Sequence, residues 1–142
     1  MAFKVFLDTN IVVDFFVASR PLHKNAVKII NAIEDGFLKG YVSESVINTT
    51  SYLVRNSKQV DAYRQEMMNM MSILKVLHCT NDTVIAGFKN GKNDLEDAVL
   101  YQIALENKIE YFITSNIKDL KRLEQMKLPV LSSNEVLELI AF

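Results

Sequence analysis

The chain has 142 residues, of which 49% are hydrophobic and 23% are charged, and its formal net charge is −1. This length suits one domain and this composition suits a packed core, so intrinsic disorder and a second full domain are excluded. A protein that held nucleic acid by its overall charge would be clearly basic, so only a local basic surface could serve that purpose here.

The composition also argues against a secreted or membrane-bound protein. The longest stretch without Asp, Glu, Lys or Arg covers residues 45–54, far short of the roughly 20 apolar residues that cross a bilayer. The start of the chain lacks the pattern of a secretory signal peptide. The single cysteine, Cys79, excludes a disulfide framework, and its mostly apolar neighbours predict a buried thiol in a reducing compartment. We therefore expect a cytoplasmic protein without membrane contact.

Short runs rich in β-branched and aromatic residues alternate with longer stretches in which apolar residues recur at helical spacing. The short runs predict strands over residues 3–7, 38–42, 75–78, 111–114 and 129–131. The longer stretches predict helices over residues 11–18, 21–33, 45–55, 60–74, 81–89, 94–107, 116–126 and 132–140. This alternation predicts one α/β domain over residues 1–142, with a mainly parallel sheet.

Polar residues gather at three places where a predicted strand ends or the next helix begins. They are Asp8, Thr9 and Asn10; Asp94, Glu96 and Asp97; and Thr114, Ser115 and Asn116, with Asp119 three residues on. Because the carboxyl ends of parallel strands meet at one edge of a sheet, we expect these side chains to converge. Clustered carboxylates repel one another unless a cation lies among them, and oxygen ligands suit Mg²⁺ or Mn²⁺. The geometry favours a metal-dependent phosphodiesterase.

The same residues also have a purely structural interpretation. Asp94 and Asp97 have the spacing of a helix N-cap and the acid at its N3 position. Asn116 and Asp119 repeat that spacing, and Asp8 could cap the first helix. A single Asp in such a place is more often a cap than a ligand. Their shared position at one sheet edge is what favours a functional site.

Three segments resemble the PIN-domain family, which is known for metal-dependent ribonucleases and includes the toxins of VapBC-type toxin–antitoxin pairs. They are VFLDTNIVVDFF near the start, YVSESVINTTSYLVR near the middle and DLEDAVLYQIALENKIEYFITSNIKDL late in the chain. The match rests on a strand followed by DTN, a D-x-x-D-A helix and a strand followed by T-x-N, in the family's order. The resemblance covers nearly the whole chain and implies a three-layer α/β/α fold with a short, mainly parallel central sheet.

The resemblance implies catalytic roles for four residues. Asp8 and Asp97 match the family's metal-site acids. Asp94 matches the extra acid of the branch with a D-x-x-D pattern, and Asn116 falls where many members have an Asp. Asp119, three residues further on, would complete a metal shell with Asp8, Asp94 and Asp97.

The resemblance and the charge pattern together predict the substrate contacts. Thr9 and Asn10 look like the family's polar residues that orient the first Asp, and Ser115 looks like a pocket-lining hydroxyl. Lys118 belongs to a group of basic residues that could contact RNA phosphates around the pocket. The other members of the group are Lys89, Lys92, Lys121, Arg122 and Lys127.

The chain departs from the family at two acidic positions. The Glu usually found in the helix after the second strand is replaced by Thr49, and Glu44 lies more than one turn away. Asn116 is neutral where many members carry an acid. Because ligand charge largely sets the affinity for a hard cation, we expect a weak metal site that substrate phosphate completes.

The leading hypothesis is a Mg²⁺- or Mn²⁺-dependent endoribonuclease. If it is the toxin of a toxin–antitoxin pair, an antitoxin would block the pocket, and the toxin would form a homodimer through its helices. The alternative is a degenerate PIN domain that binds RNA or a protein partner without cutting. A third hypothesis is an unrelated phosphoryl-transfer protein with Asp8 as nucleophile. It ranks lower because phosphatases of that class need a second Asp where Asn10 stands.

Overall fold

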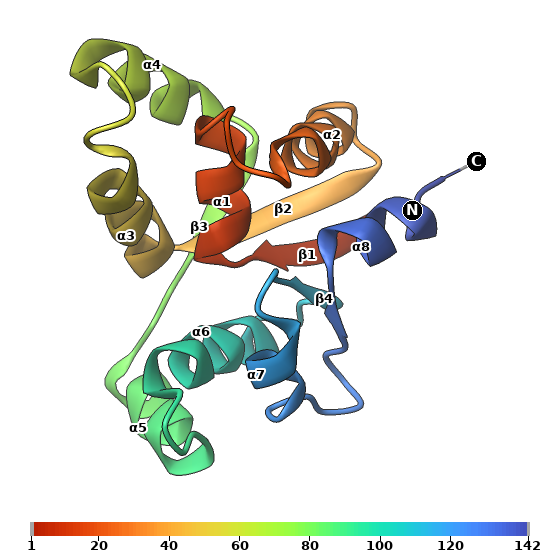
Figure 1. Cartoon of the computed structure of the whole chain (residues 1–142). Coiled ribbons are helices and arrows are strands. Elements are labelled where there is room, and N and C mark those ends of the chain that lie inside the picture. Colours follow the sequence, from red (N-terminus) through yellow and green to blue (C-terminus); the bar gives the residue numbers. More distant parts are fainter. Residues whose placement is uncertain (1, 142) are drawn as a thin grey trace.

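The computed structural model describes residues 2–141, in which five strands and eight α-helices follow one another along the chain (Figure 1). The strands are β1 (Phe3–Leu7), β2 (Leu38–Ser43), β3 (Leu74–Leu77), β4 (Tyr111–Ile113) and β5 (Val130–Leu131). The helices are α1 (Thr9–Phe16), α2 (His23–Glu34), α3 (Glu44–Val54), α4 (Val60–Met70), α5 (Asn81–Asn90), α6 (Leu95–Glu106), α7 (Ile117–Lys121) and α8 (Ser133–Leu139).

The strands form one parallel sheet in the order β3-β2-β1-β4-β5. On one face α1 packs against α2 and α3, and α2 packs against α8; on the other face α6 packs against α5 and α7 (Figure 1). The predicted α/β fold, with its mainly parallel sheet between two helical layers, is confirmed. Among the residues described, no helix is long and apolar enough to cross a membrane.

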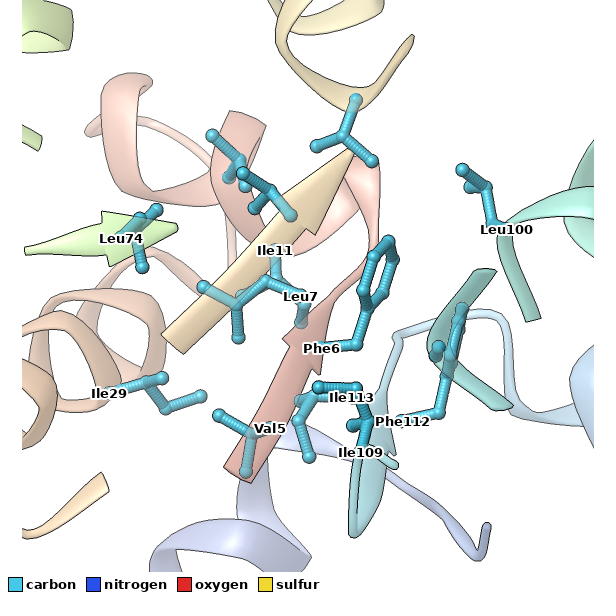
Figure 2. Packing of buried hydrophobic residues seen from close by; sticks show 14 of the residues in the cluster. Val5, Phe6, Leu7, Ile11, Ile29, Leu74, Leu100, Ile109, Phe112 and Ile113 are labelled. Carbon is cyan, nitrogen blue, oxygen red and sulfur yellow. The ribbon is translucent and has the colours of Figure 1, made fainter. Parts of the chain in front are cut away.

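The core is built around β1, the central strand of the sheet. Val5, Phe6 and Leu7 are all fully buried, since helices cover both faces of the strand. The rings of Phe6 and Phe112 stack with their centroids 5.1 Å apart, and Figure 2 shows them pointing toward Leu100 of α6. This demand for apolar side chains on both faces explains why the first predicted strand is apolar at successive positions.

The direction of strand order reverses at β1. The chain proceeds from β1 to β2 on one side of it and later returns to place β4 on the other. The register pairs Leu7 with Ile113, so Asp8 and Thr114 leave the sheet at the same level. Such a reversal opens a crevice at the carboxyl ends of the two strands, which is where open α/β sheets bind their ligands.

Two predicted helices are wrong at their carboxyl ends. α7 ends at Lys121 rather than at residue 126, because the Tyr101 hydroxyl donates to the Leu128 carbonyl and accepts from the Gln125 amide. These two hydrogen bonds hold residues 122–128 in a turn that delivers the chain to β5. Likewise α4 ends at Met70, because β3 begins at Leu74 and pairs with the edge of β2.

The prediction of a buried Cys79 is also wrong, because its thiol is exposed. Cys79 lies beyond the end of β3, the edge strand of the sheet, and directly before Thr80, which caps α5. A connection at the sheet edge has helices on fewer sides than the central strands have, so apolar neighbours in sequence do not bury it.

The close approach of α5 to α6 depends on two glycines. A Cβ at Gly87 would lie 2.8 Å from the Cα of Val99, and one at Gly91 would lie 2.7 Å from the Cβ of Ala98. Real Cβ atoms essentially never make contacts this short. The two glycines therefore set the distance between the helices, and with it the position of the loop over residues 91–94.

We predict that Gly87→Ala destabilises the protein by about 1–3 kcal/mol, the usual cost of overpacking. The loss should occur although alanine is the better helix former by up to about 1 kcal/mol. Urea unfolding would measure it. Lys89→Ala, at an exposed position of the same helix, serves as the control and should stay near the wild type. A Gly87→Ala variant at least as stable as the wild type would show that the helices can separate without cost.

Candidate active site

Asp8 is the residue around which the site is built. It follows β1 directly and is buried, with 4% of its surface exposed. Its Oδ1 accepts a hydrogen bond from the Thr9 backbone amide at 2.7 Å, so the carboxylate caps α1. Its Oδ2 accepts from the Thr114 hydroxyl, also at 2.7 Å. Both carboxylate oxygens are therefore fixed in direction before any ligand arrives.

Thr114 connects the two strand ends. Its side chain is completely buried, and its hydroxyl also accepts a hydrogen bond from the Asn116 backbone amide at 2.9 Å. The sequence analysis gave Thr114 no role of its own. The available signal was a polar residue at the end of a buried strand in the T-x-N segment. One hydroxyl thus positions both Asp8 and the turn that carries Asn116.

Asp97 enters the site from the first turn of α6. The Asn116 side-chain amide donates to its Oδ2 at 3.2 Å. A continuous chain of hydrogen bonds therefore runs from Asp8 through Thr114 and Asn116 to Asp97, and it joins segments about a hundred residues apart in the sequence. The structure confirms the predicted convergence of these three polar segments.

Burial raises the pKa of the Asp8 carboxyl above its ordinary value, although its hydrogen bonds to Thr114 and Thr9 oppose the shift. Burial, and then the negative charge of Asp8, raises the pKa of Asp97 to about 6. Glu96 and Asp94 add to that rise, and the hydrogen bond from Asn116 opposes it. Within residues 2–141, neither Asp8 nor Asp97 forms an ion pair with a Lys, Arg or His side chain.

Of the three predicted N-cap side chains only Asp8 makes a capping hydrogen bond, although Asp97 and Asp119 do lie in the first turns of α6 and α7 as the structural interpretation expects. Asp94 stands at the N-cap position of α6 and Asn116 at that of α7, yet neither side chain makes a capping hydrogen bond. Asp94 Oδ1 instead accepts from the Lys92 backbone amide at 3.1 Å. Asn116 turns its amide toward Asp97. Helix capping therefore does not account for the polar residues at the starts of α6 and α7.

A cavity of about 380 Å³ opens beside Asp97. Its acidic side consists of Asp94, Asp97 and Asp119, and its other side chains include Lys92 and Arg122. We call this cavity the Arg122 pocket. Of the predicted metal shell, it brings Asp94, Asp97 and Asp119 to one space. The charged pair of Lys92 and Arg122 was predicted only as part of a general basic rim.

The remaining predicted residues are placed differently. Thr9 is buried and offers Asp8 its backbone amide, and Asn10 is half-buried in the first turn of α1. Ser115 and Lys118 are exposed and do not line the Arg122 pocket. Thr49, which the sequence resemblance puts at the position of a Glu, is half-buried on α3.

The donor set suits a cation only in part. The buried Asp8 carboxylate and the half-buried Asp97 carboxylate have no cationic partner, and each has a raised pKa. This is the arrangement that a divalent ion would neutralise. Yet among the described residues no three His, Cys, Asp or Glu side chains lie close enough together to make a metal site by themselves. Any ion held here would need further oxygen ligands, from Asn116, from water or from a bound phosphate.

The raised pKa of Asp97 predicts how stability depends on pH without metal. Because the folded state holds this proton more tightly, stability is lost as the pH rises from about 3.8 to about 6. Asp97→Asn removes that loss, so in EDTA at pH 7.5 its melting temperature should exceed that of the wild type by a few degrees. The difference should shrink steadily toward pH 4. Thermal melts across this range provide the measurement.

Asp35→Asn is the matched control, since Asp35 is an exposed carboxylate in the turn before β2, at the opposite edge of the sheet. It should not reproduce the pH-dependent difference. An Asp97→Asn variant that is less stable than the wild type at pH 7.5 would contradict the electrostatic account.

Comparison with known proteins agrees with this geometry. The family described as "PIN domain" matches residues 4–118. Ribonuclease VapC1 of Aquifex aeolicus is 29% identical over 105 residues, which cover 71% of this chain and 73% of that protein.

Two solved structures of low identity share the fold. The toxin VapC20 of Mycobacterium tuberculosis, described as cleaving the sarcin–ricin loop, superposes with a TM-score of 0.63 at 15% identity, over 81% of this chain and 93% of that one. A toxin–antitoxin complex from Klebsiella pneumoniae gives a TM-score of 0.61 at 22% identity, over 88% and 95%. The family match spans β1 to α7, including Asp8, Asp97 and Asn116, and the chain belongs to the PIN domain family.

Proposed function

We propose that this protein is a metal-dependent endoribonuclease that hydrolyses RNA phosphodiesters. The observation that carries the proposal is that the buried Asp8 and the half-buried Asp97 meet at the β1–β4 crevice without a cationic partner. The Aquifex relative is named a ribonuclease, and the Mycobacterium structure is described as that of an RNA-loop-cleaving toxin. Both names support RNA as the substrate class.

In this proposal Asp8 and Asp97 hold one Mg²⁺ or Mn²⁺ ion, and Asn116, water or a bound phosphate supplies further oxygens, while Asp94 and Asp119 line the adjoining pocket. When bound, the ion would offset the negative charge that develops on the phosphate and polarise the attacking water. Thr114 and the Thr9 amide keep the Asp8 carboxylate in one orientation, and Asn116 does the same for Asp97. The neutral side chains of Thr49 and Asn116 leave the site with little charge, so substrate phosphate would complete the shell.

We also propose an antitoxin partner, a homodimer and a cytoplasmic location, as for a toxin of the VapBC kind. The support is the solved toxin–antitoxin complex with the same fold. Several apolar side chains on α3 and α4 are exposed and available for such contacts, namely Tyr52, Leu53, Val60 and Met68. Light scattering of the purified chain tests the dimer, and a mass of one chain would contradict it.

Cleavage of mixed single-stranded and structured RNA in the presence of Mn²⁺ tests the activity. We expect cutting that EDTA abolishes and that Asp8→Asn reduces at least about a hundredfold, because the amide keeps the helix cap but weakens the cation site. Asp35→Asn should cut as the wild type does. Cutting that persists in Asp8→Asn would point to a contaminating nuclease and leave the proposal without support.

The second candidate is a degenerate domain that binds RNA or a protein without cutting. The observation in its favour is that no three His, Cys, Asp or Glu side chains within residues 2–141 lie close enough together to hold a metal ion. Calorimetry with Mn²⁺ separates the two candidates. Absence of both cutting and Mn²⁺ binding, in protein that is shown to be folded, would favour the binding module.

Asn116→Asp should restore a carboxylate to the site with opposite effects in two conditions. Without metal it replaces a hydrogen-bond donor to Asp97 by a second negative charge, so the melting temperature at pH 7.5 should fall. Adding Mn²⁺ should raise the melting temperature of this variant by more than it raises that of the wild type, because added ligand charge strengthens cation binding. Asn116→Ser, which removes the donor without adding charge, should lack the second effect. An equal response to Mn²⁺ in both variants would exclude residue 116 from the metal site.

A further inference from the structure

The Arg122 pocket contains two cationic side chains that the proposed hydrolysis does not use. Within the described part of the chain, neither Lys92 nor Arg122 makes a side-chain hydrogen bond or an ion pair, although Asp94 and Asp119 line the same space. Arg122 stands three residues after Asp119, a spacing at which helical side chains often pair. By contrast, Lys121 on the same helix pairs with Glu124 at 3.0 Å.

The two cations approach from separate elements. Arg122 directly follows the last residue of α7, and Lys92 lies on the loop between α5 and α6. Gly87 and Gly91 allow that loop to lie close against α6. A pocket cation without a protein partner is available for an anion, and the guanidinium of arginine suits phosphate in particular. Since Asp97 belongs to both the pocket and the catalytic crevice, a phosphate bound by Arg122 would be close to the scissile one.

The other side chains of the pocket suit a base. Asn90 and Asn93 bring two amides, each with donors and an acceptor, and Leu123 brings an apolar surface. Asn93 makes no side-chain hydrogen bond within residues 2–141, and Asn90 has only a long one of 3.5 Å to Gln102. The volume of about 380 Å³ is at the small end of the range for ligand pockets. The pocket is therefore too small to admit a nucleic-acid helix.

We propose that the Arg122 pocket binds one unpaired nucleotide of the RNA, next to the phosphodiester that is cut. Arg122 and Lys92 contact its phosphate, while Asn93 and Asn90 hydrogen-bond to its base. Sequence-specific RNA recognition favours unpaired nucleotides, whose base edges are free for such contacts. The inference takes its substrate class from the proposed ribonuclease function, and it assigns base preference to the loop over residues 90–93. It also assigns the cationic contact with RNA phosphate to Arg122 instead of the predicted Lys118.

The test measures binding separately from cutting. In the Asp8→Asn background, fluorescence anisotropy would follow labelled single-stranded hexaribonucleotides of A, U and C in Mg²⁺ at several salt concentrations. Arg122→Ala should weaken binding about tenfold and reduce the salt slope by about 0.7, the value for one lost contact to a single strand. Lys121 was predicted as part of the same basic group, but it pairs with Glu124 and does not line the Arg122 pocket. Lys121→Ala therefore removes the same charge just outside the pocket, and it should change binding less than twofold.

Asn93→Ala should reduce the difference in affinity between the A, U and C hexamers more than it reduces their average affinity. Asn134→Ala, which removes an exposed amide on α8, is its control and should leave the preference unchanged. Equal losses in Arg122→Ala and Lys121→Ala would overturn the inference, since general surface charge would then explain the binding. So would a base preference that survives Asn93→Ala and Asn90→Ala together.

The outcome is distinguishable from that of the proposed function. If binding is selective and depends on Arg122 but the protein never cuts RNA, the proposed nucleotide pocket is retained and the proposed nuclease activity is rejected. Metal-dependent cutting with the same KM and base preference in the wild type, Arg122→Ala and Asn93→Ala would retain the nuclease and reject the pocket.

Discussion

The candidate site depends on the parallel pairing of β1 with β4. This register brings Asp8 and Thr114 to one level at the carboxyl edge of the sheet, where a single hydroxyl can hold both the carboxylate and the turn after β4. The stacked rings of Phe6 and Phe112 lie two residues before Asp8 and Thr114 and fix the two strands in the core. A shift of one residue in either strand would turn an apolar side chain into the crevice and a polar one into the core.

Burying carboxylates without a cation is costly, and the site reduces that cost in specific ways. Asp8 accepts two hydrogen bonds, one of which also starts α1. Asp97 accepts one from Asn116, at a position where a third carboxylate would add repulsion. The neutral amide therefore favours the metal-free fold and weakens the hold on a cation. The balance suits a site that is completed when a substrate brings its own phosphate oxygens.

The same edge of the sheet serves two purposes through different elements. The end of β1 and the start of α6 supply the acids Asp8 and Asp97, and Thr114 at the end of β4 orients Asp8. The α5–α6 loop and the turn after α7 supply unpaired cations and amides. Gly87 and Gly91 couple the two, because they allow α5 to rest against α6 and so place the loop beside Asp97. Chemistry would then depend on the strands, and substrate choice on a loop that can vary without disturbing them.

The sequence by itself determined the alternation of strands and helices and the three polar segments at strand ends, since periodicity and local chemistry encode these features. It could not place Arg122 in a pocket, because the end of α7 depends on Tyr101 holding the turn that follows. Nor could it show that Thr114 orients Asp8 or that Cys79 is exposed. Those features arise from contacts between segments far apart in the chain and from how completely neighbouring elements cover a residue, and only the tertiary structure decides them.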